Sequence, residues 1–171
     1  MRTPTPFDIT QARREHVAPV LTMIRALAQY ERLSHLCVAA ETDIEAALFG
    51  PSPAAEVLIA QKGDQVAGFA LFFHNFSTFA GRRGLWLEDL FVQPAFRGQG
   101  CGKALLRALA AIAVERNCGR FEWAVLDWNT KAVGFYQTLG AAVLPDWRIV
   151  RVAGPALSGL AAGPAVDTID P

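Results

Sequence analysis

Three glycines spaced two residues apart, at positions 98, 100 and 102, interrupt the stretch LFVQPAFRGQGCGKALLRALA, residues 90–110. Glycine has no Cβ, so the backbone can turn sharply there or approach another group closely. The glycines separate an apolar run from a helical pattern, and a helix N-terminus carries unpaired N–H groups that suit a phosphate. Arg97 and Lys103 add side-chain cations. The stretch therefore predicts an anion-binding turn.

Two common phosphate motifs do not fit this turn. The dinucleotide pattern G-x-G-x-x-G requires a third glycine where Lys103 stands, three residues after Gly100. The P-loop pattern G-x-x-x-x-G-K-[ST] requires glycine at the position of Arg97 and a hydroxyl residue at the position of Ala104. The spacing that remains is R-x-x-G-x-G, formed by Arg97, Gly100 and Gly102.

Composition limits the class of protein. A chain of 171 residues with 52% hydrophobic and 19% charged residues can bury the core of one compact domain. Its sixteen basic and sixteen acidic residues give no net charge, which argues against nucleic acid or an anionic membrane as a partner. The N-terminus MRTPTPFDIT has no apolar signal core. We therefore expect a soluble cytoplasmic protein.

Metal chemistry is not indicated. The cysteines and histidines are scattered, without paired spacing typical of metal ligands, and we expect no metal site from Cys37, Cys101, Cys118, His16, His35 and His74. Isolated cysteines in such a chain usually behave as small buried hydrophobes.

Periodicity predicts an α/β (α+β) domain over residues 1–152. A short strand in 7–13 leads into a helix in 14–33. Thr42 is the expected N-cap of a second helix, with Glu45 completing a capping box and Gly50 ending it. Two strands within 55–76 turn at Gly63, and a third strand covers 84–92.

Helical and strand patterns alternate along the chain after the glycines. An amphipathic helix follows with an apolar stripe formed by Cys101, Leu105, Leu109, Ile112 and Ala113. A strand is expected in 120–129, a helix in 130–140 ended by Gly140, and a last strand in 146–152. Residues 153–171 are rich in Ala, Gly and Pro, and we expect a partly disordered tail with a short turn of helix.

The R-x-x-G-x-G turn resembles the pyrophosphate loop of the GNAT superfamily of acetyl-CoA-dependent N-acetyltransferases. The likeness continues in register through LEDLFVQPAFRGQGCGKALL, EWAVLDWNTKAVGFYQTLGA and DWRIV, which resemble the spermidine/spermine (diamine) N-acetyltransferase branch. It covers residues 6–152. This resemblance implies a single-domain GNAT fold with a central mixed, mostly antiparallel sheet flanked by helices. It also implies acetyl-CoA as cosubstrate, no metal, and a homodimer.

Acetylation of an amine requires removal of a proton. A primary amine with a pKa of about 10.4 is mostly protonated at neutral pH, so a carboxylate near the substrate is needed. Glu88 and Asp89 are adjacent on a strand and should face opposite sides unless a bulge intervenes. The resemblance implies that Glu88 accepts the proton. Asp89 either binds a substrate ammonium or makes a structural hydrogen bond.

The departing thiolate needs a proton in return. Tyr136 stays protonated at neutral pH and has the acidity for this step, and the resemblance implies that it is the general acid. An aromatic packing role is the alternative. Asn129 suits a helix N-cap and also matches a cofactor contact of the family.

The resemblance also implies a set of cofactor-binding residues. The backbone of the strand end would run beside the pantetheine arm, where an N–H could stabilise the oxyanion, and the turn would hold the pyrophosphate. The set consists of Leu90, Phe91, Val92, Arg97, Gly98, Gln99, Gly100, Cys101, Gly102, Lys103 and Asn129.

The nature of the amine follows from the acidic residues. A polyamine needs carboxylates at several depths, but Glu31 is the one acidic residue between positions 30 and 40, and segment 74–83 has none. The composition favours a smaller diamine or an amino-acid side chain, with Glu31, Asp89, Trp86 and Phe79 as candidate substrate contacts. A peptide N-acetyltransferase and a catalytically silent CoA-binding sensor remain the alternatives.

Overall fold

The computed structural model of the chain describes residues 6–163, which fall into two compact units on either side of the boundary between Ala124 and Val125. In residues 6–124 the first unit has five strands and three α-helices: β1 Asp8–Gln11, α1 Val17–Tyr30, α2 Glu41–Phe49, β2 Glu56–Lys62, β3 Gln65–Ser77, β4 Arg82–Val92, α3 Cys101–Glu115 and β5 Phe121–Trp123. Short 3-10 turns cover Arg14–His16, Ser34–Leu36 and Pro94–Phe96.

The five strands form one sheet in the order β1-β2-β3-β4-β5. Pairing is antiparallel from β1 to β4 and parallel between β4 and β5, which confirms the expected mixed, mostly antiparallel sheet. The tight β2–β3 turn contains Gly63 at a φ of +60°, a conformation that favours glycine, as its sequence predicts.

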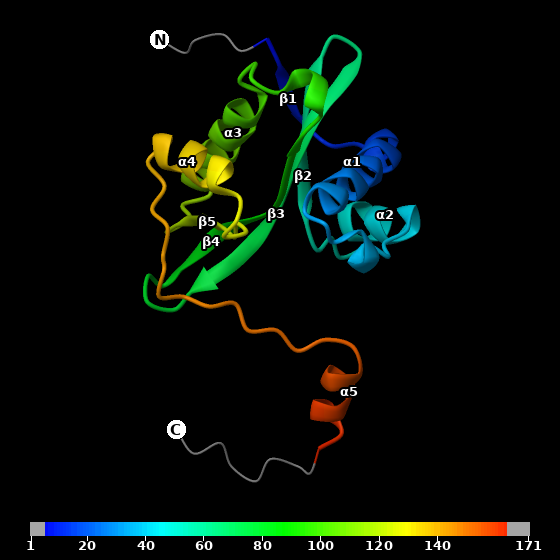
Figure 1. Cartoon of the computed structure of the whole chain (residues 1–171), viewed down its shortest axis with the longest axis vertical. Helices are drawn as coiled ribbons and strands as arrows, with labels where there is room; N and C mark the ends of the chain where they lie inside the picture. Colours follow the sequence, from blue (N-terminus) through cyan, green and yellow to red (C-terminus); the bar gives the residue numbers. More distant parts are fainter. Residues whose placement is uncertain (1–5, 164–171) are drawn as a thin grey trace. The chain divides into compact units, whose positions relative to one another are not determined.

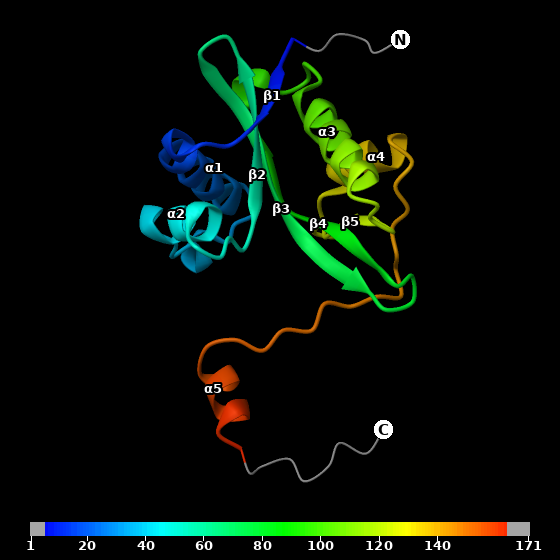
Figure 2. The same ribbon diagram turned by 180° about the vertical axis from the view of Figure 1, so that it is seen from behind.

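Helices cover both faces of this sheet. Figures 1 and 2 show α1 and α2 on one face, called here the α1 face, and α3 on the other, called the α3 face. The core of the α1 face consists of Val20, Met23, Leu48, Val57, Ile59, Phe69 and Phe91. On the α3 face four residues of the expected stripe are buried, namely Cys101, Leu105, Leu109 and Ala113, and the fifth, Ile112, is half-buried. Burial of each large apolar side chain stabilises the fold by about 1.5–3 kcal/mol.

A β-bulge in β4 changes which side chains face each helix layer. Leu71 pairs with Asp89 while the next residue of β3, Phe72, pairs with Leu87, so Glu88 is an extra residue in β4. Leu71 packs against the α1-face core. Phe72 lies beneath the guanidinium of Arg116, the C-cap of α3. Leu87 therefore faces α3 whereas Asp89 faces α1.

Two predictions for the first unit differ from the structure: the N-cap of α2 is wrong, and one strand is shorter than expected. Helix α2 begins at Glu41, and the Asp43 carboxylate accepts a hydrogen bond from the Ala40 N–H at 2.8 Å, so Thr42 is not the N-cap. The carboxylate three residues after the cap satisfies that N–H without a hydroxyl residue at the cap itself. The strand expected in 120–129 is limited to β5, Phe121–Trp123.

The second unit, in its described part, contains two helices and no strand. Helix α4 spans Thr130–Thr138 and α5 spans Pro155–Ala161. The Asn129 side chain caps α4 by accepting from the Ala132 N–H at 3.3 Å, and Gly140 follows at a φ of +88°, both as expected.

The prediction of a last strand in 146–152 is wrong, because this segment forms no strand. Ile149 and Val150 are 69% and 89% exposed, and an apolar alternating segment becomes a strand only where it finds an edge to pair with. The expected tail boundary at residue 152 lies inside this unit, and residues 164–171 lie outside the described residues. No helix in 6–163 is long and apolar enough to cross a membrane.

An ion pair fastens the end of α3 to the sheet. The guanidinium of Arg116 donates through both terminal nitrogens to the two oxygens of Glu56 on β2. Both side chains are about two-thirds buried, with exposures of 30% and 33%. The hydrogen bonds from Arg116 lower the pKa of Glu56 against the opposing effect of burial. The pair contributes stability only while Glu56 is ionised.

Removal of this pair should destabilise the protein in a pH-dependent way. Because the pKa of Glu56 is lowered on folding, its contribution is present above the ordinary glutamate pKa and is lost as pH falls through the lowered value. We expect Glu56→Gln to lower the free energy of unfolding at pH 7 by about 1–2 kcal/mol. Urea titrations between pH 3 and pH 7 measure this difference.

The exposed pair between Arg14 and Glu45 provides the control. Glu45→Gln should change the free energy of unfolding by less than about 1 kcal/mol. An equal effect of the two substitutions, or a Glu56→Gln effect that does not shrink in acid, would contradict a stabilising role for the buried pair.

Candidate active site

The glycine turn has the geometry of an anion cradle. Gly98 and Gly100 have φ values of +75° and +87°, and an added Cβ at either position would meet no heavy atom within 4 Å. The turn is therefore open in front of both glycines. Gly100 is the N-cap of α3, and the helical hydrogen bonds begin with Ala104 N–H to the Gly100 carbonyl at 2.9 Å. The N–H groups of residues 101–103 are thus available to an anion, and the turn fits a pyrophosphate.

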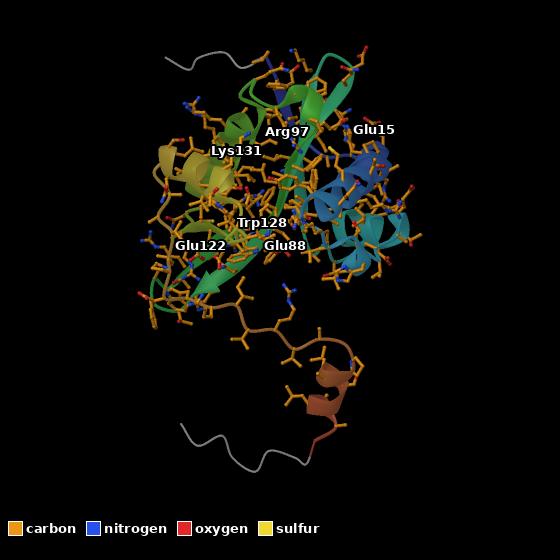
Figure 3. The ribbon with its side chains drawn as sticks, viewed as in Figure 1. Glu15, Glu88, Arg97, Glu122, Trp128 and Lys131 are labelled. Atoms are coloured by element: carbon orange, nitrogen blue, oxygen red, sulfur yellow. The ribbon has the colours of Figure 1, made fainter. Side chains whose placement is uncertain are left out.

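Side chains around the turn hold its shape. Arg97 donates from Nε to the Val92 carbonyl at 2.9 Å and lies over the rings of Tyr30 and Phe91. Arg97 therefore ties the turn to the end of β4 and to α1, a contact that its sequence position does not reveal. Figure 3 shows it near the start of α3.

Gln99 is fixed from two directions. Its amide donates to the Ala95 carbonyl at 2.9 Å and accepts from Lys62 Nζ at 2.8 Å. The sequence does not indicate Lys62 as a neighbour of the turn, because it lies 37 residues earlier and only the sheet brings it there. The β2–β3 hairpin thus supports the glycine turn.

The thiol of Cys101 is not exposed at the turn. The side chain is 1% exposed beneath α3, and burial raises its pKa to about 11. A thiol of this kind is a poor nucleophile at neutral pH. Within residues 6–163 no group of His, Cys, Asp and Glu side chains has an arrangement that could hold a metal ion.

The edge of β4 that faces β5 opens beyond Leu87. Parallel pairing joins Leu85, Trp86 and Leu87 to the three residues of β5 and extends no further among the described residues. Apart from the Val92 carbonyl, which accepts from Arg97, the backbone groups of residues 88–92 on this edge are therefore available to another extended chain. The open edge includes the segment Leu90, Phe91 and Val92 that the sequence assigns to the pantetheine arm.

Three carboxylates come together on the α1 face. The bulge puts Asp89 on this face, and Trp86, which alternates with Leu87, lies there too. The indole Nε1 of Trp86 donates to Glu88 Oε2 at 2.8 Å, so Glu88 points to the same side as Asp89. Glu31, the C-cap of α1, interacts electrostatically with Asp89. The structure thus answers which of Glu88 and Asp89 faces this side: both do.

Ionisation of the carboxylates in this cluster is unfavourable. Burial, with added repulsion from Glu88 and Glu31, raises the pKa of Asp89 to about 6. Burial also raises the pKa of Glu31. None of the ion pairs between described residues includes Glu31, Glu88 or Asp89. A cation placed among them would relieve the repulsion, so the cluster is suited to an ammonium group.

The remaining sequence candidates belong to other elements. Tyr136 is half-buried on α4 with its ring 5.5 Å from that of Phe135, and Asn129 caps the same helix in the second unit. Phe79 is fully exposed (100%) in the β3–β4 turn. Five residue steps separate that end of the hairpin from Leu87, about 17 Å at the strand rise. The structure does not bring Phe79 to the carboxylates of its own chain.

Comparison with known proteins identifies the family. The Acetyltransferase (GNAT) family matches residues 23–141. Thialysine N-epsilon-acetyltransferase of Mus musculus is 37% identical over 164 residues, covering 90% of this chain and 96% of the relative. L-ornithine N5-acetyltransferase NATA1 of Arabidopsis thaliana is 31% identical over 205 residues, covering 94% and 86%.

A solved structure has the same fold. The integron cassette protein VCH_CASS6 from the mobile metagenome of V. cholerae superposes with a TM-score of 0.78 at 27% identity, covering 94% of this chain and all of that one. The chain belongs to the GNAT acetyltransferase family. It is an acyltransferase of the amine N-acetyltransferase type.

The cradle can be tested by closing its open side. We expect Gly100→Val to abolish CoA binding measured by calorimetry, because the side chain fills the space before the N–H groups. The matched control is Gly81→Val, since Gly81 has a φ of +61° and equally open surroundings in the β3–β4 turn. Both variants carry similar backbone strain, about 1–2 kcal/mol. Equal CoA affinity in the two would exclude the cradle.

Asp89 should destabilise the free protein in a defined pH window. Its folded pKa of about 6 exceeds the ordinary value of 3.8, so stability falls as pH rises between these values. We expect Asp89→Asn to raise the free energy of unfolding above pH 6 by up to about 3 kcal/mol and to have little effect near pH 4. Denaturant titrations across pH 4–8 measure this. A pH-independent effect would contradict a charge origin.

Proposed function

We propose that this enzyme transfers the acetyl group of acetyl-CoA directly to a primary amine of a small amino-acid-like or diamine substrate. The observation that carries the proposal is the cluster of Glu31, Glu88 and Asp89 on the α1 face, beside the open edge of β4. It offers a cation site next to the backbone that would hold an acyl group. Relatives named for thialysine and ornithine support a substrate of this size.

The glycine turn supplies the cofactor side of the proposal. Backbone N–H groups of Cys101, Gly102 and Lys103 would hold the pyrophosphate, with Gly98 and Gly100 leaving room for it. The open edge of β4 at residues 90–92 would hold the pantetheine arm, where a backbone N–H can stabilise an oxyanion. Acetyl-CoA bound there supplies an acetyl thioester to an incoming amine.

Glu88 and Asp89 have different proposed roles toward the amine. The Trp86 hydrogen bond fixes Glu88, which we assign as the base that accepts the amine proton, directly or through water. Asp89, with Glu31, holds the ammonium before that step. An ammonium beside Asp89 lowers its raised pKa, so part of the repulsion within the cluster is released on binding.

Tyr136 is the proposed general acid for the departing sulfur. A phenol of ordinary acidity can give its proton to a departing thiolate. The support for this role is the tyrosine's chemistry and its position in the family motif AVGFYQTLG. Asn129 is proposed as a further cofactor contact, and its carbonyl oxygen already caps α4.

The charge distribution supports a short substrate over spermine or spermidine. The cluster contains three carboxylates, and segment 74–83 of the β3–β4 hairpin contributes Arg82 and Arg83 but no acidic residue. A long polyamine would extend its remaining charges beyond the cluster. The assembly proposed is a homodimer, consistent with exposed apolar side chains in the second unit: Trp147, Ile149 and Val150.

A thiol-release assay tests this function. Acetyl-CoA is mixed with thialysine, ornithine, lysine, putrescine, spermidine, spermine and a short peptide in turn. We expect turnover of one or more small primary amines and weaker turnover of spermine. Turnover of the peptide alone would favour the peptide N-acetyltransferase. CoA binding without turnover of any amine would favour the sensor.

Variants then assign the roles. Glu88→Gln should lower kcat by about 10²–10⁴-fold with CoA affinity unchanged, the range for a lost general base. Tyr136→Phe should also lower kcat and spare CoA binding. Asp89→Asn should mainly raise KM for the amine. A larger loss of kcat in Asp89→Asn than in Glu88→Gln would reverse the assignment of base and ammonium site.

A further inference from the structure

A second charged cluster lies on the sheet near the carboxylates and has no part in the chemistry above. Arg120 immediately precedes β5, and its Nε donates to Glu122 Oε2 at 2.7 Å. The amide nitrogen of Asn75 on β3 donates to the same oxygen at 3.4 Å. The ion pair is partly open to solvent, with exposures of 41% for Arg120 and 29% for Glu122.

Gly84 makes room for this cluster. A Cβ at Gly84 would lie 2.2 Å from Asn75 Oδ1 and 3.1 Å from Cγ of Arg120. The absence of a side chain therefore lets the arginine lie across β4. Its Nε is used by Glu122, and the two terminal nitrogens of the guanidinium carry its remaining donors.

The cluster shares a face with the proposed base. Glu122 pairs with Trp86 across the β4–β5 ladder, so both project to the α1 face, and Trp86 donates to Glu88. Figure 3 shows Glu88 and Glu122 toward the same end of the sheet. The strand spacing and rise place their Cα atoms about 8 Å apart. A chain of four or five extended bonds, such as the side chain of ornithine or lysine, spans about 5–6 Å.

We infer that Arg120 and Glu122 form the subsite for the α-amino-acid head of the substrate. The guanidinium of Arg120 would bind the α-carboxylate and the Glu122 carboxylate the α-ammonium, while the side-chain amine reaches Glu88. This inference rests on the proposed function and specifies its substrate class: free α-amino acids with a terminal primary amine.

The ion pair suits a zwitterion better than it suits a diamine. A carboxylate gains charge-assisted hydrogen bonds from a guanidinium, and an α-ammonium gains them from a glutamate. A diamine has a second ammonium but no carboxylate, so Arg120 repels it and offsets the attraction of Glu122. The pair therefore discriminates by repulsion as well as by attraction.

The test compares ligands that differ only in the carboxyl group. We measure kcat/KM for ornithine, ornithine amide and putrescine with the unaltered enzyme and with Arg120→Gln. The unaltered enzyme should prefer ornithine to both analogues by about ten- to hundredfold, the usual effect of a charge-assisted hydrogen-bond pair. Arg120→Gln should remove most of that preference by lowering kcat/KM for ornithine, with that for putrescine unchanged or higher.

Arg82→Gln is the matched control. Arg82 is an exposed arginine of the same strand pair, and it donates to Asn117 instead of Glu122. This variant should keep the preference for ornithine. CoA affinity and thermal unfolding of both variants check that the fold and the cofactor site are intact.

The outcomes separate the inference from the proposed function. Efficient acetylation of putrescine with no preference for ornithine, or a preference that survives Arg120→Gln, overturns the inference and leaves the function. If none of the amines is acetylated, the proposed function fails. Calorimetric titration of ornithine and putrescine into the CoA complex then decides the inference: Arg120-dependent binding of ornithine supports it, and its absence overturns it.

Discussion

The β-bulge at Glu88 is the constraint on which the first unit depends. One extra residue in β4 exchanges the faces of the strand between Leu87 and Asp89. Before the bulge, odd-numbered residues pack under α3; after it, odd-numbered residues face α1. A regular strand would put Asp89 beside Leu87 beneath α3, where an ionised carboxylate would cost several kcal/mol. The bulge reconciles two apolar layers with an acidic site on the same strand.

The acidic cluster on the α1 face opposes the stability of the fold. Glu31, Glu88 and Asp89 repel one another, and the raised pKa of Asp89 expresses part of that repulsion. Elsewhere the sequence places opposite charges together, as in Glu56 with Arg116 and Glu122 with Arg120. Strain of this kind is retained where a ligand relieves it, which is why perturbed groups concentrate at functional sites.

Much of the fold could be predicted from the sequence, because its signals are local. Period-2 and period-3.6 patterns predict the strands and helices. Gly63 predicts the β2–β3 turn, and the glycines at 98, 100 and 102 predict the turn before α3. Other features depend on distant partners. Residues 146–152 have an alternating apolar pattern but pair with no strand among the described residues, and Thr42 is not the N-cap because Asp43 satisfies the Ala40 N–H.

In the candidate site, too, some features are visible in the local sequence and others depend on distant partners. The glycine turn, Glu88 and Tyr136 are visible as a motif, whereas the bulge that turns Glu88 and Asp89 to one side is a property of pairing with β3. Lys62, Trp86 as a donor to Glu88, and Arg120 come to their positions through the sheet. Residue type and spacing indicate which chemistry is available; cross-strand contacts determine which groups meet.

The buried thiol of Cys101 has a consequence for chemical durability. It lies in the first turn of α3, directly after the glycine turn, and is enclosed between α3 and the sheet with its pKa raised to about 11. Alkylating agents and peroxides react with exposed thiolates, so they encounter almost none here. A cysteine can therefore follow the glycine turn without making it sensitive to oxidative or electrophilic stress.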